Sequence, residues 1–365
     1  MSRKTLEETL NENVPVIEGK KLYIWGMGNT ALLYDEGIQR LEKEGFFHIS
    51  GYCDNNIRKT EKKFFCKKPV VTLEELCKTE EICVLICSPQ FKVYREVRKQ
   101  LNGMGVENYL IDEVILKHHA KEVLQVYDSL GDLRSRETYE ELIECRMCNR
   151  LPAEKMYSGS TYFSLSAFKR RNTKEVFVDC GGYVGDTIEQ YLWRKTGSFD
   201  KIIAFEPDKN NYDAMVCRVE RLKKEWNIND EDIQLYPYGV GKDDVELEVQ
   251  KYDRNHGLGS KISVKGGGDM RDTEPCSIVS LDCFLKEPYH FLKADIEGYE
   301  YGMLLGAEKG IKANRPMIAV CIYHNAVDFY SIPLLIQRFV PEYHFAVRHH
   351  SSELDETVFY AWMEE

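Results

Sequence analysis

The 365-residue sequence contains no apolar run approaching the ~18 residues that a membrane span needs. Its first residues, MSRKTLEETLNENV, are polar and lack the apolar core of a secretory signal. Basic residues are in the minority: 49 Lys and Arg stand against 60 Asp and Glu, for a net charge of −11. Because phosphate contacts need clustered cations, this balance does not favour a protein that binds nucleic acid. Without an apolar span or a signal core, we expect a cytoplasmic protein that does not bind membranes.

Paired metal-binding cysteine motifs are also lacking. The one CxxC, Cys145 to Cys148, has no second pair, whereas structural zinc usually takes four such ligands. Others of the twelve cysteines, such as Cys83, Cys180 and Cys321, lie inside apolar runs, where cysteine behaves as a small hydrophobic residue. We therefore expect reduced cysteines without zinc or redox chemistry.

Two stretches of alternating apolar strands and helical patterns are present, and they predict an α/β protein with two Rossmann-like three-layer domains. Residues 1–112 form the first, small and of the nucleotide-binding type. Residues 113–156 are charged and helical, which is typical of a connecting arm. Residues 157–365 form the second domain, with a mostly parallel sheet closed by an antiparallel pair, YHFAVRHH and TVFYAWM.

The segment VFVDCGGYVGDT at residues 176–187 predicts a strand, a glycine turn and a helix. Glycine lets the backbone turn sharply beside a ligand, here through Gly181, Gly182 and Gly185. The carboxylates of Asp179 and Asp186 would repel a pyrophosphate but suit the ammonium and sulfonium charges of S-adenosylmethionine. The next strand ends at Glu206, a position from which a carboxylate accepts hydrogen bonds from both ribose hydroxyls.

The second domain resembles the FkbM family of S-adenosylmethionine-dependent methyltransferases, roughly from Tyr157 to Ala361. The matching segments are VFVDCGGYVGDT, IIAFEPDKNNY, SLDCFL, FLKADIEGYEYGMLLGA, RPMIAVCIYH and RHHSSELDETVFYA. The resemblance implies a class I methyltransferase fold and O-methylation of hydroxyls on sugars, glycans or secondary metabolites. It assigns cofactor binding to Asp179, Gly181, Gly185 and Glu206, and places Gly239 near the adenine.

Candidate catalytic residues follow two neighbouring strands. Asp295 and Glu297 follow HFLKA, and His324 follows MIAVCI, so they would converge at the carboxyl edge of the sheet, with Asp295 also near the cofactor. His324 is the first choice for general base and Asp295 the second. Alternatively, Asp295 and Glu297 hold a divalent metal ion that acidifies the acceptor hydroxyl.

Two further regions bear on the acceptor. His349 and His350 are adjacent on a strand and face opposite sides, so one of them lines the acceptor pocket at most. The glycine-rich region from Arg254 to Asp272 is a further candidate for part of that pocket.

A second glycine turn lies in the amino-terminal domain. Gly26, Gly28 and Ala31 follow a strand in the pattern G-x-G-x-x-A, and Asp54 ends the next strand. We expect this domain to bind a nucleotide, a sugar nucleotide or part of the acceptor, or only to pack. Two alternative functions stay open: an NAD(H)-dependent oxidoreductase or epimerase run from this domain, and a non-catalytic S-adenosylmethionine-binding protein. A homo-oligomer is possible, and the sequence does not define its size.

Overall fold

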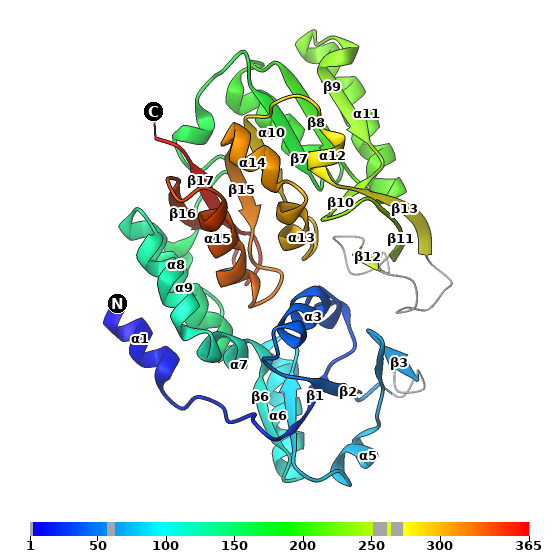
Figure 1. Ribbon diagram of the computed structural model, residues 1–365, viewed down its shortest axis with the longest axis vertical. Coiled ribbons are helices and arrows are strands. Elements are labelled where there is room, and N and C mark those ends of the chain that lie inside the picture. Colours follow the sequence, from blue (N-terminus) through cyan, green and yellow to red (C-terminus); the bar gives the residue numbers. More distant parts are fainter. Residues whose placement is uncertain (1–2, 57–62, 89, 251–260, 264–272, 365) are drawn as a thin grey trace.

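The computed structural model describes residues 3–56, 63–88, 90–250, 261–263 and 273–364 (Figure 1). A small amino-terminal domain lies beneath a larger carboxy-terminal domain in this view, and a run of helices extends along both. The Arg254–Asp272 region predicted to contribute to the acceptor pocket falls largely outside the described residues.

The amino-terminal sheet is parallel throughout, with strand order β2-β1-β5-β6. Its strands are β1 (Lys21–Trp25), β2 (Ile49–Cys53), β5 (Ile82–Ile86) and β6 (Glu107–Leu110), and a small ribbon is formed by β3 (Phe64–Phe65) and β4 (Lys68–Pro69). The helices of this part are α1 (Arg3–Asn11), α2 (Asn29–Leu33), α3 (Asp35–Lys43), α5 (Leu73–Cys77) and α6 (Phe91–Gly103). Alternate strand residues belong to different core clusters: Leu22 and Ile24 pack with α3, while Val84 and Ile86 pack with α6. Because successive strand side chains point to opposite faces, this separation places helices on both faces of the sheet.

The carboxy-terminal sheet has seven strands in the order β16-β17-β15-β14-β7-β8-β9. Its strands are β7 (Val176–Cys180), β8 (Lys201–Phe205), β9 (Ile233–Tyr236), β14 (Phe291–Ala294), β15 (Met317–Cys321), β16 (His344–His349) and β17 (Thr357–Trp362). Its helices are α10 (Asp186–Lys195), α11 (Lys209–Trp226), α12 (Leu281–Phe284), α13 (Glu300–Leu305), α14 (Glu308–Asn314) and α15 (Asp328–Phe339). β17 is antiparallel to both β15 and β16 and lies between them. The predicted closing pair is therefore present. β17, the later strand in the chain, pairs with β15, and β16 forms the edge of the sheet. Together with the parallel amino-terminal sheet, this arrangement confirms the predicted α/β fold of two Rossmann-like domains.

A second, smaller sheet, β10-β13-β11-β12, extends from the carboxy-terminal domain. Its strands are β10 (Gly239–Val240), β11 (Val245–Gln250), β12 (Lys261–Ser263) and β13 (Thr273–Val279). Short 3-10 helices occur at Glu154–Met156, Ala167–Lys169 and Asp230–Asp232.

Three helices follow β6 directly: α7 (Ile111–His118), α8 (Ala120–Ser129) and α9 (Leu133–Cys148). They join one apolar cluster that contains residues of both domains, such as Ile24, Leu142 and Ile318. Polar contacts cross between the domains as well: the Arg40 guanidinium donates to Ser331 at 3.0 Å, and the Asn325 amide donates to the Leu33 carbonyl at 3.3 Å. α3 therefore lies against the carboxy-terminal domain, as Figure 1 shows.

All twelve cysteines are free thiols. No helix within the described ranges is both long and apolar enough to cross a membrane.

Candidate active site

The glycine turn between β7 and α10 lies where the strand order of the sheet reverses, which is the usual ligand position in an open α/β sheet. Gly181 has φ +80°, and its N–H donates to the Phe205 carbonyl at 3.0 Å. A Cβ on Gly181 would lie 1.9 Å from the Asp295 carbonyl oxygen. Only glycine therefore lets the turn after β7 touch the loop after β14, and this contact holds Asp295 beside the turn.

A cavity of about 240 Å³, the smaller of the two described here, opens at this turn. Six of the predicted residues line it: Gly181, Asp186, Glu206, Gly239, Asp295 and Glu297. Asp179, Gly182 and Gly185 do not. Gly182 packs against the Met215 side chain, and Gly185 is the N-cap residue of α10. Both residues therefore shape the turn without lining the cavity.

Glu206 is buried, and its carboxylate is held by the chain around it. One oxygen accepts from the Tyr183 N–H and the other from the Asp208 N–H, both at 2.9 Å. Burial raises the pKa of Glu206 to about 7, although these two backbone donors oppose the rise. The carboxylate is thus oriented into the cavity but half protonated near neutral pH.

The affinity for S-adenosylhomocysteine is expected to rise about tenfold between pH 6 and pH 8. Glu206, with its pKa raised to about 7, is mostly protonated at the lower pH, and only the carboxylate accepts hydrogen bonds from both ribose hydroxyls. Titration calorimetry at the two pH values measures this change. Glu206→Gln should bind more weakly at pH 8 and lose this part of the pH dependence. An equal pH dependence in the variant would contradict the assignment.

Asp179 is fully buried and does not reach the cavity. The Lys293 ammonium lies 2.9 Å from its carboxylate, and Lys293 also donates to the Gly181 carbonyl at 2.6 Å. Burial raises the pKa of Asp179 to about 6, while Lys293 opposes the rise. Asp179 was predicted to contact the cofactor. In the structure its carboxylate forms a buried ion pair with Lys293, which in turn binds the backbone of the glycine turn.

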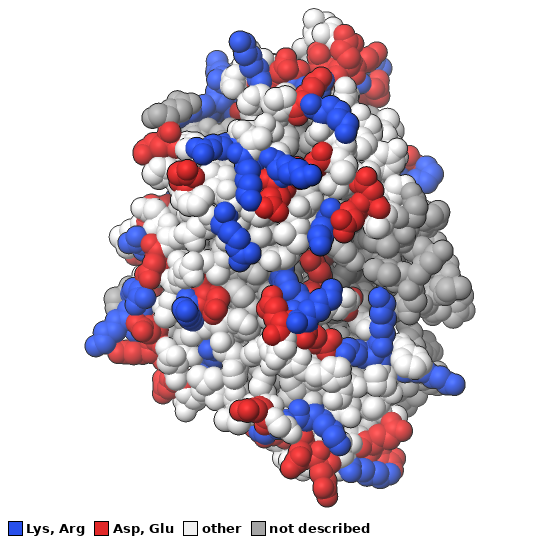
Figure 2. All heavy atoms as spheres, in the orientation of Figure 1, with Lys and Arg blue, Asp and Glu red and all other residues white. Residues whose placement is uncertain are grey.

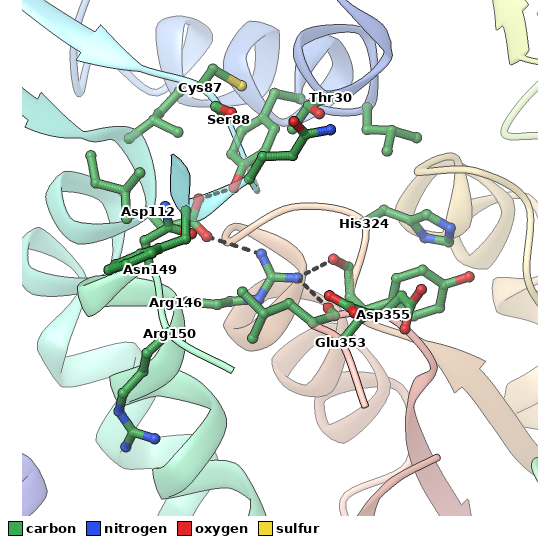
Figure 3. Close-up of a pocket in the computed structure, with 18 of the residues that line it drawn as sticks. Thr30, Cys87, Ser88, Asp112, Arg146, Asn149, Arg150, His324, Glu353 and Asp355 are labelled. Atoms are coloured by element: carbon green, nitrogen blue, oxygen red, sulfur yellow. Dashed lines mark hydrogen bonds and ion pairs between the residues drawn. The ribbon is translucent and has the colours of Figure 1, made fainter. Parts of the chain in front are cut away.

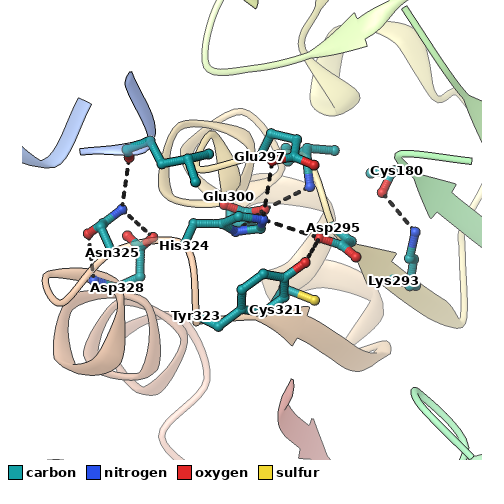
Figure 4. A network of polar contacts seen from close by, with 12 residues as sticks. Cys180, Lys293, Asp295, Glu297, Glu300, Cys321, Tyr323, His324, Asn325 and Asp328 are labelled. Atoms are coloured by element: carbon teal, nitrogen blue, oxygen red, sulfur yellow. Dashed lines mark hydrogen bonds and ion pairs between the residues drawn. The ribbon is translucent and has the colours of Figure 1, made fainter. Parts of the chain in front are cut away.

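Asp295 is at the centre of a polar network (Figure 4). The Tyr162 hydroxyl donates to one carboxylate oxygen at 2.8 Å, and the Tyr323 hydroxyl donates to the other at 3.1 Å. Burial alone would raise the pKa of Asp295, but the positive charges of His324 and Lys293 and the two hydroxyls outweigh it and lower the pKa. Asp295 is therefore an ionised carboxylate that borders the cavity.

His324 is buried between carboxylates. Its Nε2 lies 3.4 Å from Asp295 and its Nδ1 lies 3.2 Å from Glu300, while Glu297 is 3.9 Å away. Burial lowers the pKa of His324, but the three carboxylates outweigh it and raise the pKa to about 10. A ring that is already protonated cannot accept the acceptor's proton, so this environment disfavours the predicted role of His324 as general base.

We expect the His324 ring to titrate with a midpoint near pH 10, far above the ordinary histidine range. Long-range ¹H–¹⁵N spectra of protein labelled at histidine would show both ring nitrogens protonated at pH 8. His344, which is partly exposed, serves as an internal comparison. A midpoint below pH 7 for His324 would restore it as a candidate base.

Asp295, Glu300 and His324 form the group that comes nearest to a metal site, with potential ligand atoms within 4.8 Å of one another. The imidazole lies between the two carboxylates, however, because Nε2 faces Asp295 and Nδ1 faces Glu300. The closest contacts of the two carboxylates are therefore to opposite nitrogens of the ring, and each of these contacts is an ion pair. The arrangement fits a carboxylate–imidazolium–carboxylate chain and not the divalent ion predicted at Asp295 and Glu297.

Glu356 is a cavity residue that the sequence reasoning missed. It directly precedes β17 and lines the smaller cavity together with Asp295 and Tyr323. Burial and the charge of Asp295 raise its pKa to about 7. Its backbone has φ +51°, a conformation that costs a non-glycine residue free energy and is common at functional sites.

A larger cavity of about 670 Å³ lies between the two domains (Figure 3). Its wall includes Thr30 and Ser88 from the amino-terminal domain, Arg146 from α9, and His324. Tyr323 lines both cavities. Tyr323, whose hydroxyl is bound to Asp295, is thus a wall residue of both cavities.

The amino-terminal glycine turn differs from the expectation. Gly26, Gly28, Ala31 and Asp54 line neither cavity. A Cβ on Gly26 would lie 2.8 Å from the Cys87 carbonyl, so this glycine serves the packing of its own sheet. The Asp54 carboxylate, predicted to bind a ribose, accepts from the Met27 N–H at 3.0 Å and from the Asn56 N–H at 2.9 Å.

The two candidate histidines of the acceptor pocket also line neither cavity. His349 is buried and contacts the Thr357 hydroxyl at 2.9 Å, while His350 contacts the Ser158 carbonyl at 2.7 Å. Both rings are used in joining the end of β16 to neighbouring segments.

The strand order, the glycine turn and the cavity beside it are those of a class I S-adenosylmethionine-binding methyltransferase fold. Residues 179–349 match the model of the methyltransferase FkbM domain. Residues 179–349 therefore form an FkbM methyltransferase domain, as the motifs predicted.

Solved structures add a fold comparison. The crystal structure of a methyltransferase FkbM from Methylobacillus flagellatus KT superposes with a TM-score of 0.56 at 16% identity, covering 99% of this chain and 98% of that chain. The two-domain arrangement is thus shared along the whole length. An rRNA methylase from Streptococcus thermophilus (TM-score 0.31, 13% identity) covers 53% of this chain and 90% of its own. A putative methyltransferase from Streptococcus mutans in complex with SAH (TM-score 0.30, 14% identity) covers 53% of this chain and 91% of its own. These two scores are too low to carry an argument. No curated protein sequence matches the chain significantly.

Proposed function

We propose that the protein transfers a methyl group from S-adenosylmethionine to a hydroxyl group of a small molecule or glycan. The observation that carries this proposal is that Glu206 and Asp295 line one cavity beyond the carboxyl ends of β8 and β14, the two strands that flank β7. Glu206 is placed to accept the ribose hydroxyls, and Asp295, on the other side of β7, is an ionised acceptor for a substrate hydroxyl.

The residues that would hold the cofactor fit its chemistry. Gly181 and Asp186 at the turn suit the amino-acid portion, and Tyr238 and Gly239 line the same cavity near Glu206, on the adenine side. When bound, S-adenosylmethionine supplies a methyl group made electrophilic by the sulfonium.

The chain's own contribution to transfer is positioning and proton removal. Asp295 accepts a hydrogen bond from a neighbouring hydroxyl of the acceptor and so orients the molecule, while the His324 imidazolium holds Asp295 in place. The hydrogen of the reacting hydroxyl points to Glu356. The acceptor oxygen then bonds to the methyl carbon as the carbon–sulfur bond breaks, with the bonding electrons staying on sulfur. Glu356, with a pKa near 7, takes the hydroxyl proton, because a base works best when its pKa is close to the working pH.

A surface for nucleic acid is not part of this proposal. On the face in Figure 2, Lys and Arg side chains lie among Asp and Glu side chains and not in a field of their own. The overall charge of −11 agrees with an acceptor other than RNA or DNA.

Calorimetric titration with S-adenosylhomocysteine and with NAD tests the proposal. We expect micromolar binding of the first and none of the second, followed by release of S-adenosylhomocysteine when hydroxyl acceptors are supplied. NAD binding without S-adenosylhomocysteine binding would favour an oxidoreductase instead. Cofactor binding without turnover of any hydroxyl acceptor would favour a non-catalytic binding protein.

A further inference from the structure

The larger cavity is built by both domains and shares the wall residue Tyr323 with the cavity of the proposed methyl transfer. Ser88 follows β5 of the amino-terminal sheet, and Tyr323 follows β15 of the carboxy-terminal sheet. At about 670 Å³ it falls within the usual size range of a site for a small molecule. Because Tyr323 also lines the smaller cavity, the two cavities are neighbours.

The cations on its wall are already paired. The Arg146 guanidinium donates to the Asp112 carboxylate at 3.0 Å, and Arg146 also donates to the backbone carbonyls of Tyr323 and Leu354 (Figure 3). Arg150 binds Glu141 at 2.7 Å and Glu144 at 3.1 Å. The charge of each guanidinium is therefore already offset by a carboxylate of the protein, which weakens its attraction for a phosphate or carboxylate ligand.

Two further anions on its wall are not paired in this way. Glu353 and Asp355 come from the connection between β16 and β17 and line the same cavity. Among the residues placed in the structure, no Lys or Arg forms an ion pair with either carboxylate, and Asp355 accepts only a serine hydroxyl. An anionic ligand would therefore meet net repulsion.

Hydrogen-bond donors without acceptors are also present. The Arg146 Nε and the Asn149 Nδ2 have no acceptor among the described residues, and the two residues are only 6% and 3% exposed. Both nitrogen atoms are closed off from the cavity, so the polar groups that a ligand meets there include the carboxylates of Glu353 and Asp355 and the side chains of Thr30 and Ser88. The rest of the wall is largely apolar, with Leu33, Leu110 and Ile111 among its residues.

We propose that this interdomain cavity binds the methyl acceptor, and that the acceptor is an uncharged, hydroxyl-bearing molecule with an apolar body. The amino-terminal domain then serves as an acceptor-binding wall and not as a site for a nucleotide or sugar nucleotide. Gly26 and Asp54 contact only their own domain, as described above, and this agrees with the role of a wall. The inference rests on the proposed methyl transfer and adds the charge and location of its substrate.

Matched probes that differ in charge test the substrate class. With the protein saturated with S-adenosylhomocysteine, calorimetry would compare p-nitrophenyl hexosides with p-nitrophenyl glucuronide and UDP-glucose. We expect at least one neutral hexoside to bind about tenfold more tightly than the glucuronide, and UDP-glucose not to bind. The double variant Glu353→Gln/Asp355→Asn should narrow the gap between hexoside and glucuronide. Binding of UDP-glucose, equal binding of the glucuronide, or no binding of any hexoside would overturn the proposal.

A cavity-filling variant tests the location. Ser88→Trp should weaken hexoside binding at least about tenfold, because the indole would occupy the space beyond β5. Ser198→Trp, at a half-buried position that lines neither cavity, is the matched control and should leave hexoside binding unchanged. Equal hexoside binding by Ser88→Trp and the wild type would show that the ligand binds elsewhere.

Binding of S-adenosylhomocysteine separates the two levels of the argument. If the wild type and Ser88→Trp both bind it but no hexoside binds, the cavity inference fails and the proposed function stands. If hexosides bind in the cavity but S-adenosylhomocysteine does not bind, the proposed function fails.

Discussion

Replacement of Glu356 by Gln is expected to lower kcat by roughly 10²- to 10⁴-fold, the range that a general base contributes. The amide keeps the size and the hydrogen-bonding oxygen of the side chain but cannot take a proton. In the wild type, kcat should rise through pH 7 as Glu356, whose pKa is raised to about 7, becomes ionised. The variant should lose this rise, and its affinity for S-adenosylhomocysteine should change little.

The matched control for Glu356 is Glu364→Gln. Glu364 follows the other end of β17, where its exposed carboxylate lies 3.2 Å from His344, far from the cavity wall. Turnover with an accepted hydroxyl substrate, measured between pH 5.5 and pH 9, gives both the rate and the profile. A Glu356→Gln enzyme with full kcat would remove Glu356 from the proposed chemistry while leaving the cofactor site intact.

Replacement of Lys293 by Met is expected to destabilise the fold by about 3–5 kcal/mol, because it leaves a buried carboxylate without its partner charge. Lys293 and Asp179 are each at most 2% exposed, and their charged atoms are 2.9 Å apart. The loss should be smaller at pH 5 than at pH 8. Asp179, with its pKa raised to about 6, is largely protonated at the lower pH and then carries no charge to compensate.

Urea unfolding of Lys293→Met, Asp179→Asn and the double variant measures this coupling. The double variant should be more stable than Lys293→Met alone, since it removes both charges together. Lys201→Met breaks the more exposed pair with Glu287 and should cost under about 1 kcal/mol. A single Lys293→Met variant that loses no more stability than Lys201→Met would contradict the proposed support of the turn.

The strand tips were the predictable part of the site. Glu206, Asp295 and Glu297 each follow an apolar run that forms a parallel strand, and the carboxyl ends of such strands share one edge. The same rule found the glycine turn. The pattern of apolar runs therefore identified the sheet and the glycine and carboxylate residues at its carboxyl edge, which are six of the residues that line the smaller cavity.

Glu356 was missed because the rule considers residues that follow a strand, whereas Glu356 precedes one. β17 runs antiparallel to β15, so its beginning, and not its end, lies at the edge where the cavity opens. Tyr162 was missed for a different reason: it precedes β7 in an irregular segment, with φ +64°, where no periodic pattern exists.

Lys293 and His324 show how partners decide a side chain's role. β14 and β7 are neighbouring parallel strands, and their register places Lys293 directly beside Asp179. Each of these two apolar strands contains one charged residue. That pairing was open to a sequence argument. The position of Glu300 beside the His324 ring was not, because it depends on how the DIEGYE turn folds back over β15.

The position of β17 has a consequence for the order of folding. β17 follows every other strand of its sheet along the chain, yet it lies between β15 and β16, and β16 pairs with no other strand of the described sheet. β16 joins the sheet only through β17, so this half of the sheet closes when β17 pairs with β15. Glu356 meets Asp295 only at that step. Enzymatic activity would then appear only in molecules in which β17 has paired with β15.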